Sequence, residues 1–209
     1  MTDQRYEEWR QRIDSVFADK SPIDGSVEVH TSPSGQFSLE VSVYSTGPDT
    51  WNYSRGVVRR ATDQVTIADI KRNYGTFWHA WVKHQNGNEY LLCGEDYQGY
   101  NIIELQSGRN EVYFPEEAFN GSGFCWVVVH PSPDGLTLAV DGCYWACPYE
   151  LVFFDFKSPM DLPLTELARI DDFEETEGWN ANNTFAYLRS EESGSQEAAW
   201  ERRLVSPEP

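Results

Sequence analysis

The sequence contains two similar segments of strand-like residues, and this repetition constrains the fold more than any other feature. The first begins at Trp81 and passes through the tight turn Asn86-Gly87. The second begins at Trp126, 45 residues later, and passes through the turn Asp134-Gly135. Each unit then continues as strand, tight turn, strand, variable hairpin, strand and turn. A chain built in this way is expected to form repeated small antiparallel sheets.

Apolar and polar residues alternate with a period of two along most of the chain. Between residues 37 and 43, for example, Phe37, Leu39, Val41 and Val43 are apolar and the residues between them are polar. Such alternation predicts half-buried strands. Further strand-like runs cover residues 52–60, 77–84, 89–94, 100–105, 110–114, 124–130, 136–141, 149–156 and 184–189. Many short strands separated by turns indicate an all-β sandwich, barrel or propeller. The segment 62–72 is compatible with either a short helix or an insert.

A short motif recurs at the start of these units. Ser32-Pro33-Ser34-Gly35 resembles Ser132-Pro133-Asp134-Gly135, which suggests a third copy beginning near residue 27, and the last unit ends in Phe154-Asp155-Phe156. A strand, an S-P-D-G turn, a hairpin and a strand ending in F-D-F resemble one blade of a β-propeller of the WD40-like or TolB-like kind.

The resemblance implies blade-like sheets over about residues 27–76, 77–115 and 124–167, with 179–189 as a partial fourth unit. Gly-His and Trp-Asp pairs, which WD40 blades carry, do not occur in the matching places. The length of 209 residues is also too short for a closed ring of usual blades. A generic antiparallel meander, whose tight turns converge on the same residues, is the alternative explanation.

The N-terminal segment shows the period of a helix. Within residues 3–18, the side chains of Tyr6, Trp9, Ile13 and Phe17 recur at steps of three and four, so they share one face. We therefore expect a helix within residues 1–20 that packs on the sheet.

The rest of the chain divides by composition. Residues 21–190 are expected to form a single all-β domain, an antiparallel meander of three to four blade-like sheets. Residues 191–209 are expected to form an acidic, partly flexible tail, in which 196–204 resemble a short helix.

The chain is strongly acidic. It carries 34 Asp and Glu against 16 Lys and Arg, which gives a net charge of −18. The excess is concentrated in residues 85–155 and 171–209, and the acidic run 171–177 is interpreted as solvated charge. This balance excludes a phosphate backbone as partner, because nucleic-acid affinity rests on clustered Lys and Arg. The sequence has neither an apolar run of membrane-spanning length nor a leader-like N-terminus, so a cytoplasmic protein with no membrane partner is expected.

Aromatic residues beside acids in the hairpin loops give the best functional clue. Such tips resemble the anchoring residues of protein interfaces. The predicted partner-binding residues are Glu95, Asp96, Tyr97, Asp141, Tyr144, Trp145 and Glu150. These features predict a non-catalytic, inhibitor-like or immunity-like protein that engages a basic protein partner. It is expected to be a monomer or weak homodimer without a cofactor.

The cysteines supply an alternative. Cys93, Cys125, Cys143 and Cys147 are expected to be reduced thiols in the core. Cys143 and Cys147 are nevertheless weak candidates for a metal site, because their spacing of four suits a loop ligand pair. A metal-dependent or cysteine-dependent hydrolase that uses the Asp141–Cys147 region is therefore the competing hypothesis. No P-loop, G-x-S-x-G or G-x-G-x-x-G motif supports another enzyme class.

Overall fold

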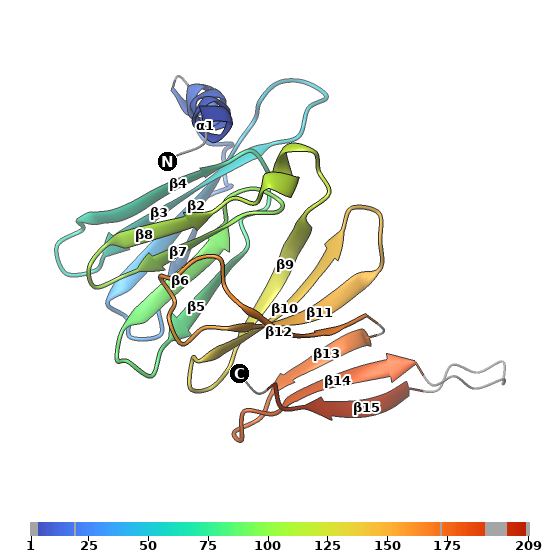
Figure 1. Cartoon of the computed structure of the whole chain (residues 1–209). Helices are drawn as coiled ribbons and strands as arrows, with labels where there is room; N and C mark the ends of the chain where they lie inside the picture. Colours follow the sequence, from blue (N-terminus) through green and yellow to red (C-terminus); the bar gives the residue numbers. More distant parts are fainter. Residues whose placement is uncertain (1–3, 19, 172, 191–199, 208–209) are drawn as a thin grey trace.

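A computed structural model describes residues 4–18, 20–171, 173–190 and 200–207. It contains one α-helix, α1 (Gln4–Phe17), followed by strands that form antiparallel sheets in chain order (Figure 1). The predicted all-β class with an N-terminal helix is confirmed. Within the described residues, α1 is too short and too polar to cross a membrane.

Each sheet is made of strands that are consecutive in the chain. The first holds β1 (Glu28–Thr31), β2 (Phe37–Tyr44), β3 (Tyr53–Arg60) and β4 (Thr66–Arg72). The second holds β5 (His79–Lys83), β6 (Glu89–Gly94), β7 (Tyr100–Glu104) and β8 (Arg109–Tyr113), and a 3-10 turn, η1 (Glu116–Phe119), follows it. The third holds β9 (Phe124–Pro131), β10 (Thr137–Tyr144), β11 (Tyr149–Asp155) and β12 (Glu166–Ile170). The fourth holds β13 (Phe173–Trp179), β14 (Phe185–Ser190) and β15 (Trp200–Val205).

These four meanders confirm the resemblance to propeller blades, and the described residues form no closed ring. Two local predictions are corrected. The ambiguous segment 62–72 supplies β4, which pairs with β3 and completes the first sheet. The short helix expected over 196–204 is replaced by β15 from Trp200 onward, because this segment pairs with β14 along its whole length. Residues 191–199 lie outside the described part of the chain.

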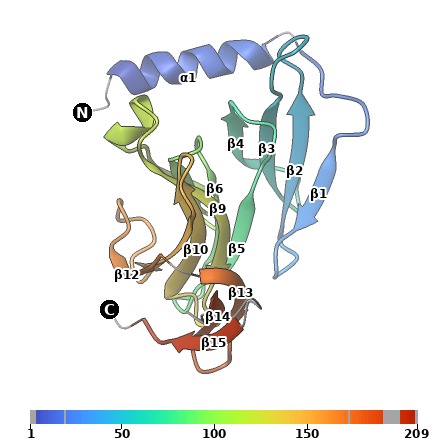
Figure 2. The same cartoon turned by 90° about the vertical axis from the view of Figure 1, so that its right-hand side faces the viewer.

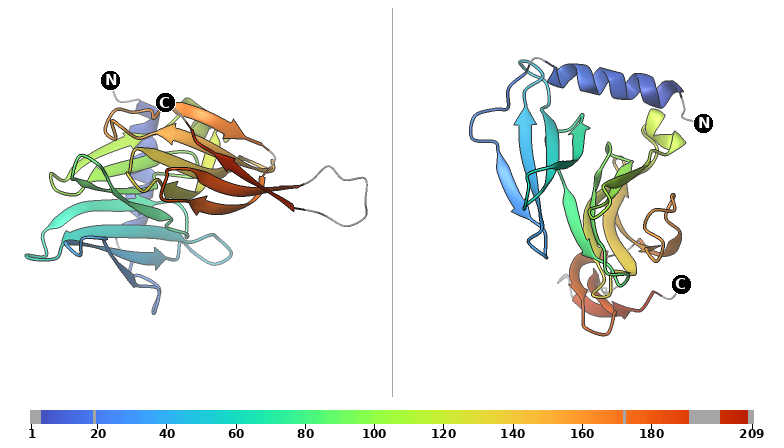
Figure 3. Two further views of the ribbon diagram at one scale, coloured as in Figure 1. Left: turned by 90° about the horizontal axis from the view of Figure 1, so that it is seen from below. Right: turned by 90° about the vertical axis from the view of Figure 1, so that its left-hand side faces the viewer.

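The sheets lie face to face, and the inner sheets bury both of their faces. In β6, Leu91 points toward the first sheet, where it packs in one cluster with Leu39 and Val58. Its neighbour Leu92 points toward the third sheet, where it packs in another cluster with Val140. Successive side chains of a strand point to opposite faces, so a strand covered on both sides must be apolar throughout. Figure 3 shows the successive sheets along this stack.

A third cluster joins the third and fourth sheets. Phe153 of β11 packs against Phe185 of β14, and the Trp179 indole of β13 lies edge-on to Phe153. The Trp179 Nε1 also donates a hydrogen bond of 2.7 Å to the carbonyl of His130. The fourth sheet is therefore held by apolar contact and by a polar contact at the end of β9.

The turns at one end of the sheets connect neighbouring sheets. Ser34, in the first S-P-S-G turn, donates its backbone N–H to Glu89 of the second sheet at 2.9 Å. The His84 Nε2 lies 3.0 Å from the Phe156 carbonyl of the third sheet. Asn183 donates its side-chain amide to Asp134 and so connects the fourth sheet to the third. The repeated turn motifs thus position one sheet on the next.

The outer faces at both ends of the stack carry ion pairs. On the first sheet, Arg55 forms a bidentate ion pair with Asp69, and the Arg59 guanidinium lies 3.5 Å from the Glu40 carboxylate. On the fourth sheet, Arg202 pairs with Glu177 at 2.5 Å. Repeat arrays need polar end faces to remain separate from one another. These ion pairs end the stack without a further sheet.

Helix α1 lies across one end of the first two sheets (Figure 2). Its Ile13 and Phe17 are buried, and the Phe17 ring packs edge-on against Tyr44 of β2. Toward its N-terminal end, the Trp9 ring lies 4.6 Å from that of Phe114, which follows β8. The helix therefore covers an apolar surface that the sheets leave open.

A buried carboxylate fixes α1 in place. Glu95, which follows β6, is 2% exposed. It accepts hydrogen bonds from the Tyr6 hydroxyl at 2.7 Å, from Arg10 at 2.9 Å and from the Asn101 amide at 2.5 Å. Burial beside this carboxylate raises the pKa of Tyr6, so the hydroxyl remains a donor. Buried charges are stable only when paired and hydrogen-bonded in this way.

Deletion of residues 1–20 is expected to unfold or aggregate the protein. It exposes apolar surface under Ile13 and Phe17, each worth about 1.5–3 kcal/mol when buried. It also leaves the buried Glu95 charge without Arg10, against a total stability of about 5–15 kcal/mol. Thermal unfolding and size-exclusion chromatography measure the effect. A truncated protein that stays monomeric and equally heat-stable would show that α1 contributes nothing to the fold.

The two related turns offer a matched test of contact between sheets. Gly35 and Gly135 have left-handed backbones with φ of +73° and +72°. A methyl group at Gly35 meets nothing within 4 Å, whereas one at Gly135 would lie 2.5 Å from the Lys83 carbonyl. We expect Gly35→Ala to cost about 1–2 kcal/mol from backbone strain alone, and Gly135→Ala to cost more. Urea unfolding compares the two. Equal losses would mean that the turn does not contact the second sheet.

Candidate functional site

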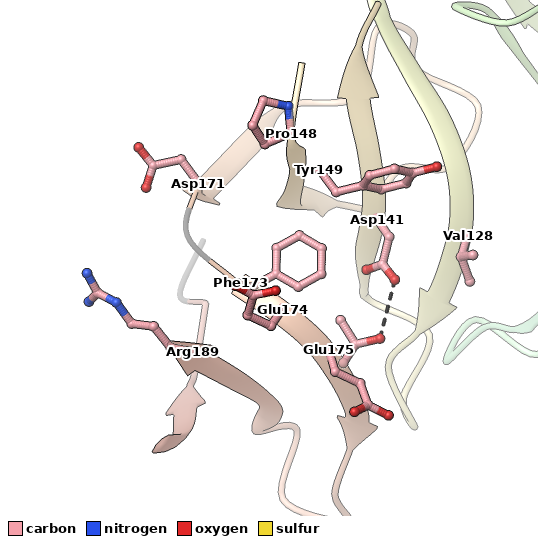
Figure 4. Close-up of a pocket in the computed structure, with 10 residues that line it drawn as sticks. Val128, Asp141, Pro148, Tyr149, Asp171, Phe173, Glu174, Glu175 and Arg189 are labelled. Carbon is pink, nitrogen blue, oxygen red and sulfur yellow. Dashed lines mark hydrogen bonds between the residues drawn. The ribbon is translucent and has the colours of Figure 1, made fainter. Parts of the chain in front are cut away.

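A groove of about 680 Å³ lies between the third sheet and the first strand of the fourth. Figure 4 shows Asp141 and Val128 on one side of it and Asp171 and Arg189 on the other. The full lining comprises Val128, Asp141, Pro148, Tyr149, Asp171, Phe173, Glu174, Glu175, Thr176 and Arg189. The groove exists because β13 packs beside β9 and β11 and contacts only part of their surface.

Asp141 is the innermost acid of the groove. It lies on β10 two residues after Ala139, so its side chain points to the same face, toward the fourth sheet. Its Oδ2 accepts a hydrogen bond of 3.3 Å from the Thr176 hydroxyl and lies 3.3 Å from His130 Nε2. Its Oδ1 is buried and has no hydrogen-bond partner among the described residues. Asp141 thus keeps acceptor capacity inside the groove.

Further acids line the outer part of the groove. Asp171, Glu174 and Glu175 are exposed and follow one another from the end of β12 into β13. Arg189 of β14 is the basic residue of the lining. With Asp141, the carboxylates outnumber the guanidinium four to one. A groove with low-dielectric walls concentrates the field of such charges, so this one attracts cations.

Exposed aromatic residues border the acids. Tyr149 is 49% exposed and forms part of the groove wall. Trp145, in the β10–β11 loop, is 71% exposed, and its ring lies edge-on to that of Tyr97 with centroids 6.1 Å apart. Rigid aromatic rings lose little entropy on contact, so exposed rings beside acids suit the contact surface of an interface.

The structure brings only some of the predicted partner-binding residues together. Tyr97 and Trp145 are in contact, and Asp141 lies in the adjoining groove. Glu95 is not available to a partner, because it is buried under α1 and bonded to Arg10. The prediction for Glu95 is therefore wrong.

Other predicted residues have roles inside the molecule. Asp96 is half-buried, burial raises the pKa of its carboxyl, and its carbonyl accepts a hydrogen bond from Arg72. Tyr144 packs edge-on against Phe124 and lies under the Arg169 guanidinium. Glu150 forms an ion pair with the same arginine. Tyr144 and Glu150 thus form a separate group from the groove.

The four cysteines differ in burial, although all were predicted to lie in the core. Cys93 and Cys125 are buried, as expected for core thiols, and burial raises the pKa of Cys93 to about 12. Cys143 is half-buried opposite Cys125, and burial raises the pKa of its thiol as well. Cys147 is exposed, which corrects its assignment to the core. Within the described residues, no three His, Cys, Asp or Glu side chains are grouped to hold a metal ion.

Sequence reasoning missed several residues of the groove. Asp171, Glu174 and Glu175 belong to the acidic run predicted to be solvated, and no pattern in the sequence predicts Thr176 as a groove residue. The acidic run itself is the feature of the sequence that could indicate this site. The hydrogen bond between Thr176 and Asp141, 35 residues earlier in the chain, depends on how the fourth sheet packs on the third. Local spacing in the sequence therefore does not predict it.

Comparisons with known proteins give little functional information. No protein-family model matches the chain. The chain is 39% identical over 144 residues to the uncharacterized protein R762 of Acanthamoeba polyphaga mimivirus, covering 68% of this chain and 55% of that protein. It thus spans about half the length of this curated relative.

Solved structures with similar folds have low sequence identity to the chain. The oligogalacturonate lyase of Vibrio parahaemolyticus is 10% identical with a TM-score of 0.47, covering 81% of this chain and 48% of that one. The β-propeller domain of Cps50 (Swd1) from Myceliophteria thermophila is 11% identical with a TM-score of 0.42, covering 85% and 71%. TolB from Acinetobacter baumannii is 11% identical with a TM-score of 0.39, covering 90% and 47%. Values of this size carry no argument about activity.

Thiol titration at pH 8 is expected to reveal one fast cysteine in the folded protein. Cys147 is exposed, whereas burial holds the pKa of the Cys93, Cys125 and Cys143 thiols above their ordinary value, so these remain protonated. Cys147→Ser should remove the fast phase, and the other three thiols should react only in denaturant. A fast phase that survives in Cys147→Ser would contradict this assignment.

Proposed function

We propose that the protein is a non-catalytic binding protein that engages a basic segment of a protein partner in the acidic groove. The observation that carries the proposal is the joining of four carboxylates in one groove with an exposed aromatic wall. In this proposal the partner contacts mainly the groove, and not the tips of the hairpin loops as expected from the sequence. Of the residues predicted to bind a partner, Asp141 lines this groove, and Tyr149 supplies its exposed aromatic side chain.

The groove chemistry suits arginine or lysine side chains. Carboxylates accept charge-assisted hydrogen bonds from guanidinium groups, which are stronger than bonds between neutral groups. The unpartnered Oδ1 of Asp141 offers one such acceptor in the interior of the groove. Tyr149 presents a ring on which the cation or the aliphatic part of the side chain can pack. A segment with neighbouring basic residues would use both features.

The overall charge supports a role in association. At −18, the chain repels acidic molecules and attracts basic ones over distances beyond direct contact. Charges at the rim of an interface act mainly on the association rate and on its salt dependence. Asp171, Glu174 and Glu175 are exposed and occupy such rim positions. They are thus expected to steer a basic partner toward Asp141.

The state of the cysteines supports binding over the competing hydrolase. A cysteine nucleophile reacts as the thiolate and needs a lowered pKa. In Cys143 the shift has the opposite direction, because burial and the nearby Cys147 and Glu150 raise the pKa of its thiol. The Asp141 carboxylate is engaged with Thr176 and His130 in the groove.

The end faces of the stack support a monomeric binding unit. Arg55 with Asp69 on the first sheet, and Arg202 with Glu177 on the fourth, cover surfaces that a further sheet would otherwise occupy. Desolvating such pairs in a dimer interface is costly. We therefore propose a monomer whose partner binds at the groove.

Reversal of two groove charges tests the location of the proposed site. Glu174→Lys with Glu175→Lys should weaken binding of a nine-residue arginine peptide at least tenfold and flatten its salt dependence. Glu7→Lys with Glu8→Lys changes the net charge by the same amount on exposed positions of α1 and serves as the control. Titration calorimetry at several salt concentrations measures both variants.

The comparison separates a local site from general charge attraction. If both double variants weaken binding equally, the peptide responds only to net charge and the groove is not the site. If only the groove variant loses affinity, the partner surface is located there. Thermal unfolding of both variants checks that the fold is retained, since all four residues are exposed.

A further inference from the structure

A second, smaller cavity of about 250 Å³, here called the aromatic pocket, opens between the second and third sheets. Most of its wall is made of the rings of Tyr74, Trp78, Tyr97, Trp126, Trp145 and Tyr149. Trp145 is 71% exposed and Tyr149 is 49% exposed, so a molecule in solution can reach both rings. The Tyr97 ring contacts those of Tyr74 and Trp145. The pocket therefore offers an accessible aromatic surface.

The charged and strongly polar groups of the lining are not available to an occupant. Arg72 is 1% exposed, and its guanidinium donates to the backbone carbonyls of Thr76 at 2.7 Å and Asp96 at 3.0 Å. The Trp78 Nε1 atom is buried. Among the described residues that line the pocket, none is an Asp or a Glu. An occupant therefore meets mainly apolar surface, which suits a side chain without polar atoms.

The aromatic pocket and the acidic groove lie on opposite faces of the third sheet. Val127 of β9 lines the pocket, and the next residue, Val128, lines the groove, because successive side chains of a strand point to opposite faces. Tyr149, the first residue of β11, contributes to the lining of both. Figure 4 shows this ring on the groove side, near Asp141. A peptide that crosses the end of the third sheet at Tyr149 therefore reaches both cavities.

We propose that the aromatic pocket receives one aromatic side chain of the partner whose basic residues occupy the acidic groove. This inference rests on the proposed function and names the kind of segment that the partner presents, which is a phenylalanine-like ring close to a run of arginine or lysine. Protein interfaces concentrate their binding energy in a few buried anchors that fill pockets, and charged residues surround them. The pocket supplies the anchor site, and the groove supplies the complementary charge.

The size of the pocket and the arrangement of its rings favour an aromatic anchor. A cavity of about 150 Å³ holds benzene, so one of about 250 Å³ accepts a phenylalanine side chain with its methylene group. Aromatic pairs prefer edge-to-face or offset contacts. The Tyr97 and Trp145 rings already lie at 81° to each other, so an inserted ring can meet the face of one and the edge of the other.

The thickness of the third sheet sets the spacing between the anchor and the basic residues. Packed sheets lie about 10 Å apart, so the cavities on the two faces of one sheet are separated by a similar distance. An extended chain rises about 3.3 Å per residue and covers this distance in three to four residues. We therefore expect the partner to carry a spacer of about three residues between the aromatic side chain and the first basic residue.

Titration calorimetry of the full-length protein with three peptides tests the proposal. The first peptide carries a phenylalanine, a Gly-Ser-Gly spacer and six arginines. The second has alanine in place of the phenylalanine, and the third lacks the spacer. We expect the first to bind about tenfold more tightly than either of the others, because only its ring and its arginines reach both cavities together. Equal binding of the first and second peptides overturns the proposal and leaves the groove as an arginine site. Equal binding of the first and third overturns the simultaneous use of both cavities.

Two exposed tryptophans give a matched pair of variants. Trp145→Ala should reduce the advantage of the phenylalanine peptide over the alanine peptide to less than threefold. Trp51 is 64% exposed in the β2–β3 loop, so Trp51→Ala removes the same side chain away from the pocket and should keep the tenfold advantage. The groove variant with Glu174→Lys and Glu175→Lys should weaken binding of all three peptides and keep their ratio. If Trp145→Ala and Trp51→Ala behave alike, the ring does not enter the aromatic pocket.

A direct probe tests the pocket even where the proposed function fails and no arginine peptide binds. N-acetyl-phenylalaninamide, titrated into the 15N-labelled full-length protein, should shift the Trp145 indole N–H signal saturably, with the signal assigned from Trp145→Phe. A saturable shift without peptide binding supports the pocket as a site for an aromatic side chain and refutes the groove as the basic site. A Trp145 signal that responds neither to the peptides nor to the amide overturns the proposal.

Discussion

The fold depends on one constraint: the inner sheets are apolar on both faces and need a neighbour on each side. Leu91 and Leu92 are consecutive in β6, are fully buried and belong to two different clusters. A sheet of this kind has no solvent-facing side, so it is stable only within a stack. The first and fourth sheets end the stack because their outer faces carry ion pairs, including Arg55 with Asp69. Helix α1 covers one end of the first two sheets and is fixed there by Glu95.

The candidate site lies at a junction of this stack. Sheets that meet face to face leave gaps where their loops diverge, and the loops can then vary without disturbing the core. The acidic groove occupies the junction of the third and fourth sheets, and a smaller pocket lined by Tyr74, Trp78 and Trp145 lies between the second and third. Tyr149 contributes to the lining of both. The Asp141 oxygen without a hydrogen-bond partner is a local departure from the well-satisfied core, as is usual at functional sites.

Local patterns in the sequence were sufficient for the strands and insufficient for the sites. Alternation at Phe37, Leu39 and Val41 identified a strand because one face of it is buried. The segment with Ile67 and Ile70 was ambiguous, since its pairing with β3 is interrupted by a bulge near Arg59. The prediction of Glu95 as a partner-binding residue fails because nothing near it in sequence shows that Arg10, 85 residues earlier, bonds to it. Asp141 and Thr176 likewise meet in the groove because two sheets pack together. Their spacing in the sequence does not predict this contact.

Hydrogen–deuterium exchange with and without a bound arginine peptide tests the central claim, that the groove is the partner surface. The account predicts slowed exchange in the 145–149 loop and across residues 173–176, the backbone segments that carry Tyr149 and Glu174. Exchange in α1 and on the first sheet should not change, because these elements lie at the other end of the stack. Protection centred on α1, or spread evenly over all acidic segments, would contradict the account.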